Sequence, residues 1–459
     1  MLAALSTSAL PPGNAVPVSA EMRLRYVLRH FALAYEAVPE GLIGYPGSHR
    51  PIEVAEAAGG FFRGQESYPA APNYREWAGR PVPFFFDSQP AAPLLTVAPG
   101  RIRISADVVA AAFYLLSGWQ EYFSTTRDRH GRFPYAASVQ QQYGFVALPV
   151  VNYYFDVLKV AVEHITGRRL KPRTWGGATF AAFISHDIDN LRSGWKAPTK
   201  ATLQQRQLLK FGRLAWRHFT RPDAWDNLEA VAAAVAGYGA RSTFFILPEH
   251  QPGADGTPNA DHRLTPQLRE RLHELQQQDH EIGLHASIGT ATDLHSFLAE
   301  KENRLGLAVA GNRFHYLRWE PRQTPALLEA AVETGLKYDS TLGFAEHFGF
   351  RNSYCQPFYL FNFATGTEHA FLEISLNVMD VTLHHPNYLQ LRAEEILPTL
   401  QPMFAEIEKF GGVATILWHN DHFDPANTIT GPEQFTEIMR HLQQCGAAFL
   451  TGSQIVAEL

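Results

Sequence analysis

Residues 179–189 read Thr-Phe-Ala-Ala-Phe-Ile-Ser-His-Asp-Ile-Asp, an apolar run that ends in a histidine and two acids. Such a run is typical of a strand buried on both faces of a parallel sheet. Residues two apart on an extended segment project to the same side, so Asp187 and Asp189 should converge on one pocket. Two carboxylates placed in this way repel each other unless a cation or a shared proton lies between them. The stretch therefore predicts a strand with a functional site at its carboxyl end, although one of the acids could instead cap the turn that follows.

Seven further apolar runs rich in β-forming residues follow along the chain. They cover residues 242–247, 281–285, 314–318, 336–340, 371–376, 413–418 and 447–450. Helical stretches are expected between them, at residues 227–237, 266–278, 293–305, 325–335, 394–409 and 431–443. This alternation predicts parallel strands joined by crossover helices. A set of about eight strands predicts a (β/α) barrel, complete or distorted, and a doubly wound open sheet is the alternative.

The part of the chain before Gly176 has a different pattern. Helices are expected at residues 22–37, 108–123 and 150–165, and a short strand at 81–86. Residues 171–177 read Lys-Pro-Arg-Thr-Trp-Gly-Gly and contain structure breakers, which indicate a boundary. The predicted fold class is therefore α/β, with a distorted (β/α) barrel domain at residues 173–459 preceded by a smaller mixed α+β domain at residues 1–172.

Composition and charge exclude several classes of protein. The net charge is −6 with histidine neutral, and lysine and arginine are not clustered as a nucleic-acid partner would require. The only cysteines, Cys355 and Cys445, exclude a disulfide framework and a cysteine-rich zinc site. No segment approaches the roughly 20 apolar residues of a membrane span. Residues 1–20 lack the basic region and apolar core of a signal peptide, so a cytoplasmic protein is expected.

Histidines and acids recur where the predicted strands end, which is where a parallel barrel carries its chemistry. His285 follows an apolar run at 281–284, and His419 follows another at 413–418. Either histidine could bind a metal or donate a proton, or could be a buried residue bonded to the backbone. Of the two acids that follow the first strand, one could bind a metal while the other accepts a proton from water.

Four motifs, taken in order, give the chain a family resemblance. They are Asp187-Ile188-Asp189, Gly283-Leu284-His285-Ala286-Ser287, Tyr338-Asp339-Ser340-Thr341 and Leu417-Trp418-His419. Together they resemble the polysaccharide deacetylases of the NodB-homology type, carbohydrate esterase family 4. The chain is most similar to a divergent bacterial branch that carries an uncharacterised N-terminal domain, and residues 128–133 and 149–152 resemble that domain.

The resemblance implies a role for five residues. Asp187 falls on the family's general base, and Asp189 and His285 fall on its metal ligands. Arg318 is the best match to the arginine that orients the base, and His419 falls on the general acid. The cofactor that this implies is a divalent metal ion, in the first place zinc, with cobalt or nickel as alternatives.

The sequence departs from the family's pattern at one ligand. The family supplies two histidines four residues apart, but four residues after His285 stands Gly289. We expect His315 to be the third ligand, because the branch's Arg-Gln-His pattern stands here as Arg313-Phe314-His315, and Ser287 is a weaker alternative. Three protein ligands are common in catalytic zinc sites.

The expected function follows from these assignments. Trp418, Asp339 and Arg351 are candidates for contacts with substrate, and Trp418 could equally belong to the core. The resemblance implies a metal-dependent hydrolase that removes N-acetyl groups from a carbohydrate. Two alternatives stay open. One is an inactive carbohydrate-binding or scaffold protein on the same barrel, and the other is an amidohydrolase that acts on a small amide.

Overall fold

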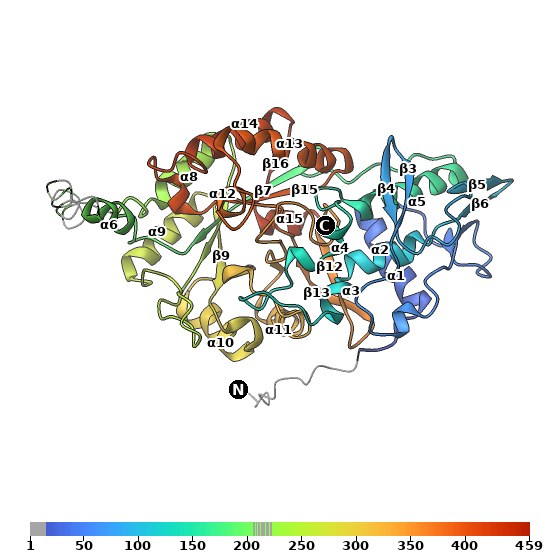
Figure 1. The fold of residues 1–459 in the computed structure, drawn as a ribbon, viewed down its shortest axis with the longest axis horizontal. Coiled ribbons are helices and arrows are strands. Elements are labelled where there is room, and N and C mark those ends of the chain that lie inside the picture. Colours follow the sequence, from blue (N-terminus) through green and yellow to red (C-terminus); the bar gives the residue numbers. More distant parts are fainter. Residues whose placement is uncertain are drawn as a thin grey trace.

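The computed structural model describes residues 15–204 and 223–459, with single positions between them. The expectation about a signal peptide concerns residues 1–20, of which 1–14 lie outside the described residues. In Figure 1 the blue N-terminal elements form one lobe and the barrel forms the other. The predicted fold class is confirmed: a distorted (β/α) barrel follows a smaller mixed α+β part.

Eight parallel strand segments form the barrel. They are β7 (Ala181–Ile188), β8 (Thr243–Ile246), β9 (Glu281–Ala286), β10 (Gly311–Phe314), β11 (Tyr338–Asp339), β13 (Thr367–Glu373), β14 (Val378–Met379) and β15 (Val413–Leu417). Their order is β13-β11-β10-β9-β8-β7-β15-β14. The strands β13 and β14 lie at opposite ends of this order yet belong to the continuous segment 367–379, so the sheet curls round on itself. Strand β12 (Phe358–Asn362) adds an antiparallel edge, and β16 (Ala448–Phe449) pairs with the start of β7.

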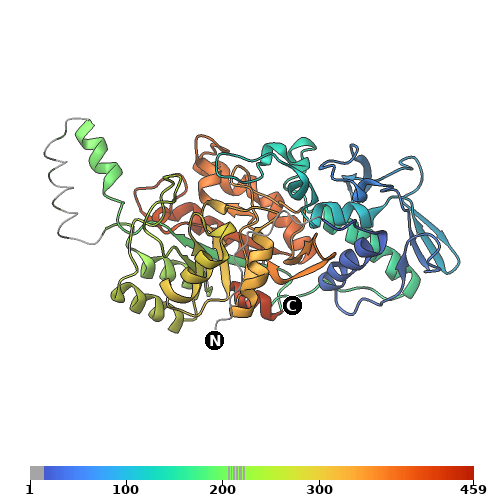
Figure 2. The ribbon, with the colours of Figure 1, turned by 90° about the horizontal axis from the view of Figure 1, so that it is seen from below.

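Helices connect these strands and most of them cover the outside of the barrel (Figure 1), whereas the last helix packs through Ile455 into the same apolar cluster as Phe183. They are α8 (Leu228–Ala236), α9 (Pro266–Gln277), α10 (Leu294–Leu298), α11 (Thr324–Ala331), α12 (Asp380–His384), α13 (Ala393–Phe410), α14 (Pro432–Gln444) and α15 (Gly452–Ala457). The helix α10 continues as the π-helix Ala299–Arg304. The six helices predicted for the barrel are all present, although the second half of one (293–305) is a π-helix and the last turn of another (325–335) is a 3-10 helix. Helix α6 (Lys196–Gln204) stands away from the rest of the barrel (Figure 2).

Successive residues of the barrel strands face two different apolar layers. Phe183 of β7 belongs to the cluster inside the barrel, whereas Ile184 packs in the outer layer with the helices. Side chains alternate along a strand, so Ser185 and Asp187 lie on the inner face with Phe183. His186 lies on the outer face, where its ring meets aromatic rings of β8 and α14. This alternation decides which polar residues reach the inside of the barrel.

The N-terminal part combines helices with two small sheets. The helices are α1 (Ala20–Ala34), α2 (Val108–Leu116), α3 (Trp119–Phe123), α4 (Val139–Gln142) and α5 (Val150–Thr166). The strands are β1 (Ile43–Gly44), β2 (Ile52–Val54), β3 (Asn73–Trp77), β4 (Arg80–Phe84), β5 (Leu95–Ala98) and β6 (Arg101–Ile104). One sheet has the order β1-β2-β6-β5, and β3 and β4 form a hairpin. The predicted helix 108–123 is two helices, because Gly118 between them adopts a left-handed φ of 71°.

One predicted strand is misplaced. The expected strand 314–318 begins where β10 ends, and the residues that follow are irregular. Tyr316 and Leu317 have φ values of 59° and 52°, a region that side-chain-bearing residues rarely adopt. Two such residues in succession end the strand, so the extended segment lies three residues earlier than expected.

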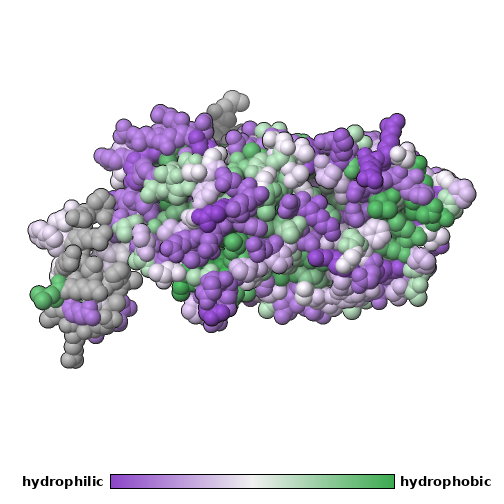
Figure 3. All heavy atoms as spheres, turned by 90° about the horizontal axis from the view of Figure 1, so that it is seen from above, coloured by the Kyte–Doolittle hydropathy of each residue, from purple (hydrophilic) through white to green (hydrophobic). Residues whose placement is uncertain are grey.

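The boundary at residue 172 stays a prediction. Apolar contacts cross it, because Tyr26 of α1 and Phe113 of α2 pack on Phe361 of β12 with ring centroids 5.3 and 4.9 Å apart. Hydrophilic residues predominate on the face shown in Figure 3, with hydrophobic patches between them. Among the described residues, none of the helices has the length and apolar character needed to cross a membrane.

Candidate metal centre and active site

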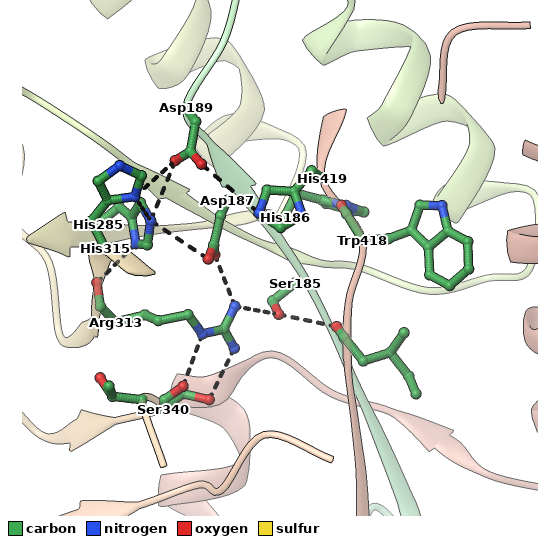
Figure 4. Close-up of polar contacts among 12 residues, drawn as sticks. Ser185, His186, Asp187, Asp189, His285, Arg313, His315, Ser340, Trp418 and His419 are labelled. Carbon is green, nitrogen blue, oxygen red and sulfur yellow. Dashed lines mark hydrogen bonds and ion pairs between the residues drawn. The ribbon is translucent and has the colours of Figure 1, made fainter. Parts of the chain in front are cut away.

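Five polar side chains meet at the carboxyl ends of the barrel strands (Figure 4). Asp187 lies near the end of β7 and Asp189 just beyond it, while His285 lies on β9. His315 follows β10, and His419 follows β15 at a distance of two residues. All five positions continue the inward-facing register of their strands, so the sheet itself brings them together.

Three of these residues form a compact group. The Oδ1 atom of Asp189 lies 3.3 Å from Nε2 of His285 and 3.5 Å from Nδ1 of His315. The two ring nitrogens are 3.1 Å apart. Ligand atoms arranged tetrahedrally around zinc at the usual bond lengths lie about 3.3 Å from one another. The spacing of Asp189, His285 and His315 therefore fits a cation of this kind.

The outer hydrogen bonds of the two histidines select tautomers in which, when the rings are neutral, the facing nitrogens can bind a cation. Nδ1 of His285 lies 2.9 Å from the carbonyl oxygen of Arg313, and Nε2 of His315 lies 3.2 Å from that of Pro258. A carbonyl can only accept, so each neutral ring carries its proton on the outer nitrogen and directs a lone pair inward. The Oδ1 atom of Asp189 is buried and has no hydrogen-bond partner. Three buried acceptors that face one another require a cation or an extra proton between them.

The charges within the group shift its pKa values in opposite directions. Burial alone would raise the pKa of Asp189, but its electrostatic interaction with His315 and its hydrogen bond and electrostatic interaction with His285 lower it well below its usual range. Burial would lower the pKa of His285, and the neighbouring carboxylates of Asp187 and Asp189 outweigh this and raise it. Burial dominates for His315 and lowers its pKa to about 4. Asp189 ionised and His315 neutral are the protonation states that a metal ligand requires.

Asp187 is held by a buried arginine, Arg313 of β10, which also points into the barrel. Nη1 of Arg313 donates to Oδ1 of Asp187 at 2.9 Å and to Oγ of Ser185 at 2.9 Å. The other guanidinium nitrogens donate to the carbonyl and the hydroxyl oxygens of Ser340. Arg313 is fully buried, and its guanidinium lies over the ring of Phe245. The second oxygen of Asp187, Oδ2, stays directed at the group of ligand atoms, 3.6 Å from Nε2 of His285.

His419 approaches the group from the opposite side and is oriented by Asp380. Nδ1 of His419 lies 2.8 Å from Oδ1 of Asp380, and the backbone N–H of His419 donates to the other oxygen at 2.5 Å. Nε2 of the same ring faces Oδ2 of Asp189 at 3.9 Å. Burial would lower the pKa of His419, but the carboxylate of Asp380 outweighs this and raises it well above its usual value. His419 is therefore protonated at neutral pH.

The arginine predicted to orient the base is not at the site. Arg318 is partly exposed and pairs with Asp255 at 3.3 Å. Arg313 occupies the predicted place at Asp187, because the strand that carries it ends at residue 314 and the arginine inside the barrel is therefore the earlier one.

The three candidates for substrate contacts also lie elsewhere. Trp418 and Asp339 are fully buried and fall on the outward-facing positions of β15 and β11. The indole of Trp418 packs near Phe435 of α14 and points away from the site (Figure 4). Asp339 accepts hydrogen bonds from Asn312 and Thr341. Arg351 is buried against the N-terminal part and does not line the site.

Two neighbours of the site were given no role by sequence reasoning, and one open alternative is now placed. Arg313 stands in the Arg313-Phe314-His315 pattern without having been matched to the base, and Asp380 follows the expected strand 371–376. The inward-facing register of β10 could have singled out Arg313. Ser287, the weaker candidate for third ligand, donates its hydroxyl hydrogen to Glu300. Gly289 has open space beside its α-carbon and lines a cavity of about 360 Å³ next to the loop after β10.

Comparisons with known proteins concern the N-terminal part and the fold. A family of unknown function, DUF7033, matches residues 47–167. No curated protein matches the chain in sequence. Puue allantoinase is similar in structure, with 13% sequence identity, a TM-score of 0.40 and coverage of 62% of this chain and 91% of that chain.

Two deacetylase structures are also similar to this chain. A probable polysaccharide deacetylase from Pseudomonas aeruginosa PAO1 has 14% identity, a TM-score of 0.39 and coverage of 62% of this chain and 92% of its own. The catalytic domain of peptidoglycan N-acetylglucosamine deacetylase from Eubacterium rectale ATCC 33656 has 12% identity, a TM-score of 0.31 and coverage of 59% and 87%. At these identities the likeness concerns the fold, and no function is carried over from it.

Proposed function

We propose that this protein is a metal-dependent hydrolase that cleaves the amide of an N-acetylated carbohydrate. The observation that carries the proposal is the group of Asp189, His285 and His315, whose ligand atoms lie 3.1–3.5 Å apart and include a buried oxygen of Asp189 with no hydrogen-bond partner. A carboxylate and two imidazoles suit zinc, and cobalt or nickel as alternatives. A divalent cation held there supplies Lewis acidity, which polarises an amide carbonyl and makes an attacking water easier to deprotonate.

Asp187 is the general base of the proposed reaction. Its Oδ2 atom points toward the ligand atoms, while Oδ1 is occupied by Arg313. Arg313 offsets the cost of burying the carboxylate and fixes its orientation, so the free oxygen can take a proton from water. Arg313 is a positioning residue, because its own donors are all directed at protein oxygens.

His419 is the general acid. Asp380 accepts a hydrogen bond from Nδ1–H, and in the imidazolium Nε2 carries the second proton, which faces the site. The pKa of His419 is raised by this carboxylate, so the imidazolium is present at neutral pH and can protonate the departing amine nitrogen. The base lies 3.6 Å from His285 and the acid 3.9 Å from Asp189, so both border the ligand group, as an amide hydrolysis that adds water and releases an amine requires.

The substrate class rests on the resemblance of the four motifs to the NodB-type deacetylases. Acetate and a free amino sugar would be the products. The two alternatives, an inactive carbohydrate-binding protein and an amidohydrolase for a small amide, differ from this in what the purified protein releases.

The first experiment is elemental analysis of purified protein beside Asp189→Ala and His285→Ala. Near-stoichiometric zinc, cobalt or nickel is expected in the wild type and much less in both variants. His295→Ala is a matched control, because His295 is exposed and lies at the start of α10, away from the ligand group. A panel of N-acetylated sugars and of small amides is then assayed for acetate and amine release.

Each alternative has its own result. Acetate from the sugars supports the proposal, whereas turnover of small amides alone favours the amidohydrolase. Bound metal without turnover of either class favours an inactive protein. No metal in the wild type, even after incubation with excess ion, contradicts the metal-dependent mechanism.

A further inference from the structure

A turn of the N-terminal part reaches the residue that follows the ligand His315. Residues 124–134 connect α3 to the 3-10 helix Tyr135–Ala137 and lie against the loop after β10. Arg132 donates from Nη1 to the carbonyl oxygen of Tyr316 at 2.9 Å. The ring of His130 stacks on the ring of Tyr316, with centroids 5.0 Å apart and planes at 14°. The ring of Tyr316 in turn contacts that of His315 at 4.3 Å.

The turn holds its own shape. Oδ1 of Asp128 accepts hydrogen bonds from the backbone N–H groups of His130 and Arg132, at 2.8 and 2.9 Å. Oδ2 of Asp128 accepts from Nε of Arg132 at 2.7 Å. Gly131 takes the left-handed φ of 77° that closes such a turn, and the Arg132–Asp128 pair is largely buried. His130 and Arg132 are thereby presented in fixed positions to the barrel.

The backbone that they contact is strained. Tyr316 and Leu317 both have positive φ, which is unfavourable for residues with a β-carbon and persists only where the surroundings impose it. The side chain of Leu317 is buried in a small apolar cluster, which supplies one restraint. The turn 128–132 supplies the other, through the carbonyl and the ring of Tyr316.

We propose that the turn Asp128–Arg132 is a positioning device for the metal ligand His315. It clamps the strained Tyr316 and so fixes the ring of His315 at the distance from Asp189 and His285 that a cation requires. The N-terminal part would then help to orient a ligand of the proposed metal site. This inference rests on the proposed metal-dependent function.

The test measures cation affinity directly. Metal-free protein is titrated with Co²⁺ and Zn²⁺ and followed by calorimetry and by the visible absorption of bound Co²⁺. Arg132→Gln is expected to weaken binding by about ten-fold and to change the Co²⁺ spectrum, because residues that orient a ligand typically contribute about 10–100-fold to metal affinity. His130→Ala is expected to weaken binding by a smaller factor, about three-fold.

Two further variants separate positioning from a general loss of structure. His130→Phe keeps an aromatic ring on Tyr316, so it should restore wild-type affinity. Arg101→Gln changes an exposed arginine of β6 far from the turn and should leave affinity unchanged. If Arg132→Gln does not fold, the comparison of His130→Ala with His130→Phe still decides the question.

The outcomes distinguish this inference from the function on which it rests. Wild-type protein that binds neither cation overturns both. Wild-type protein that binds while Arg132→Gln and His130→Ala bind equally well overturns the positioning role alone. Unchanged affinity together with a raised KM and an unchanged kcat would assign the turn to substrate contact instead, and would also overturn it.

Discussion

A single residue, Asp380, favours the protonated form of His419. The carboxylate is fully buried at the start of α12, and its two oxygens are directed at the ring and the backbone N–H of His419. Burial alone would raise the pKa of Asp380, but His419 and His422 lower it well below its usual range. Asp380 therefore stays ionised and favours the imidazolium form of its partner.

The first prediction concerns Asp380→Asn. An acid must be protonated to act, so activity falls as the pH rises through the pKa of His419. Because that pKa is raised, the fall occurs at higher pH than an ordinary histidine would give. Removal of the charge of Asp380 should move the basic limb of the pH–rate profile down by about 1–3 pH units.

The measurement is the pH dependence of kcat beside an NMR titration of His419. Asp424→Asn is the control, because Asp424 lies in the following turn and bonds only its local backbone. A basic limb that stays in place in Asp380→Asn would exclude His419 as the acid. A shift in both variants would point to a general effect of charge.

The sequence could indicate which residues meet at the site, because the ends of the predicted strands carry Asp187, Asp189, His285 and His419. The side on which each residue lies was harder to predict. Trp418 is adjacent to His419 but faces outward, and Asp339 does so too. A one-residue change of register reverses every side chain of a strand, and apolar runs buried on both faces do not reveal the register.

Close packing between elements sets a second limit on what the sequence reveals. The ring of Tyr338 on β11 lies against the backbone of β10 at Gly311 and against that of α15 at Gly452. A β-carbon at either glycine would overlap the ring. The absence of a side chain at Gly311 therefore allows the two neighbouring strands to enclose a tyrosine inside the barrel.

The second prediction is that Gly311→Ala destabilises the protein by about 1–3 kcal/mol, because overpacking forces the ring or the strand to move. Denaturant unfolding monitored by circular dichroism measures the change. Gly60→Ala is the control, since Gly60 has ordinary φ and open space beside it, and should change stability by less than about 0.5 kcal/mol. Equal stability of the two variants would contradict the packing argument.

Long helices with a clear apolar periodicity were predicted correctly, and very short strands were not. The helices α9, α13 and α14 match the prediction because a three-turn or longer amphipathic pattern has few alternatives. The two-residue strand β14 was missed, since so short a segment carries no pattern and depends on its partner β15. The same limit misplaced β10, whose end is set by the irregular backbone at Tyr316.

Polar contacts between distant segments join the N-terminal part to the barrel. Glu121 of α3 accepts two hydrogen bonds from the guanidinium of Arg351, at 2.7 and 2.6 Å, and both side chains are almost fully buried. Gln140 donates to the carbonyl of Arg351, and Asn152 donates to Gln356. Such pairings across more than 200 residues follow from the assembled fold, so a single sequence does not predict them.

The third prediction is that the Glu121–Arg351 pair stabilises the contact between the N-terminal part and the barrel. Glu121→Ala leaves a buried guanidinium without its partner, and Arg351→Ala leaves a buried carboxylate. Each single change should cost about 3–5 kcal/mol, and the double variant should cost less than the sum because no uncompensated charge remains. Thermal unfolding should show one transition in the wild type, since the apolar contacts of Phe361 with Tyr26 and Phe113 also cross the joint.

A double-mutant cycle in denaturant measures the coupling, and calorimetry counts the transitions. The exposed pair Arg103–Glu53, between β6 and β2, is the control, and its removal should leave the unfolding midpoint nearly unchanged. Additive single and double variants would mean that Glu121 and Arg351 are not coupled. Two separate transitions in the wild type would mean that the N-terminal part unfolds independently of the barrel, which would contradict the prediction. A single transition that shifts as a whole in the Glu121→Ala variant would mean that the barrel, which carries the candidate metal ligands, loses stability when this contact with the N-terminal part is removed.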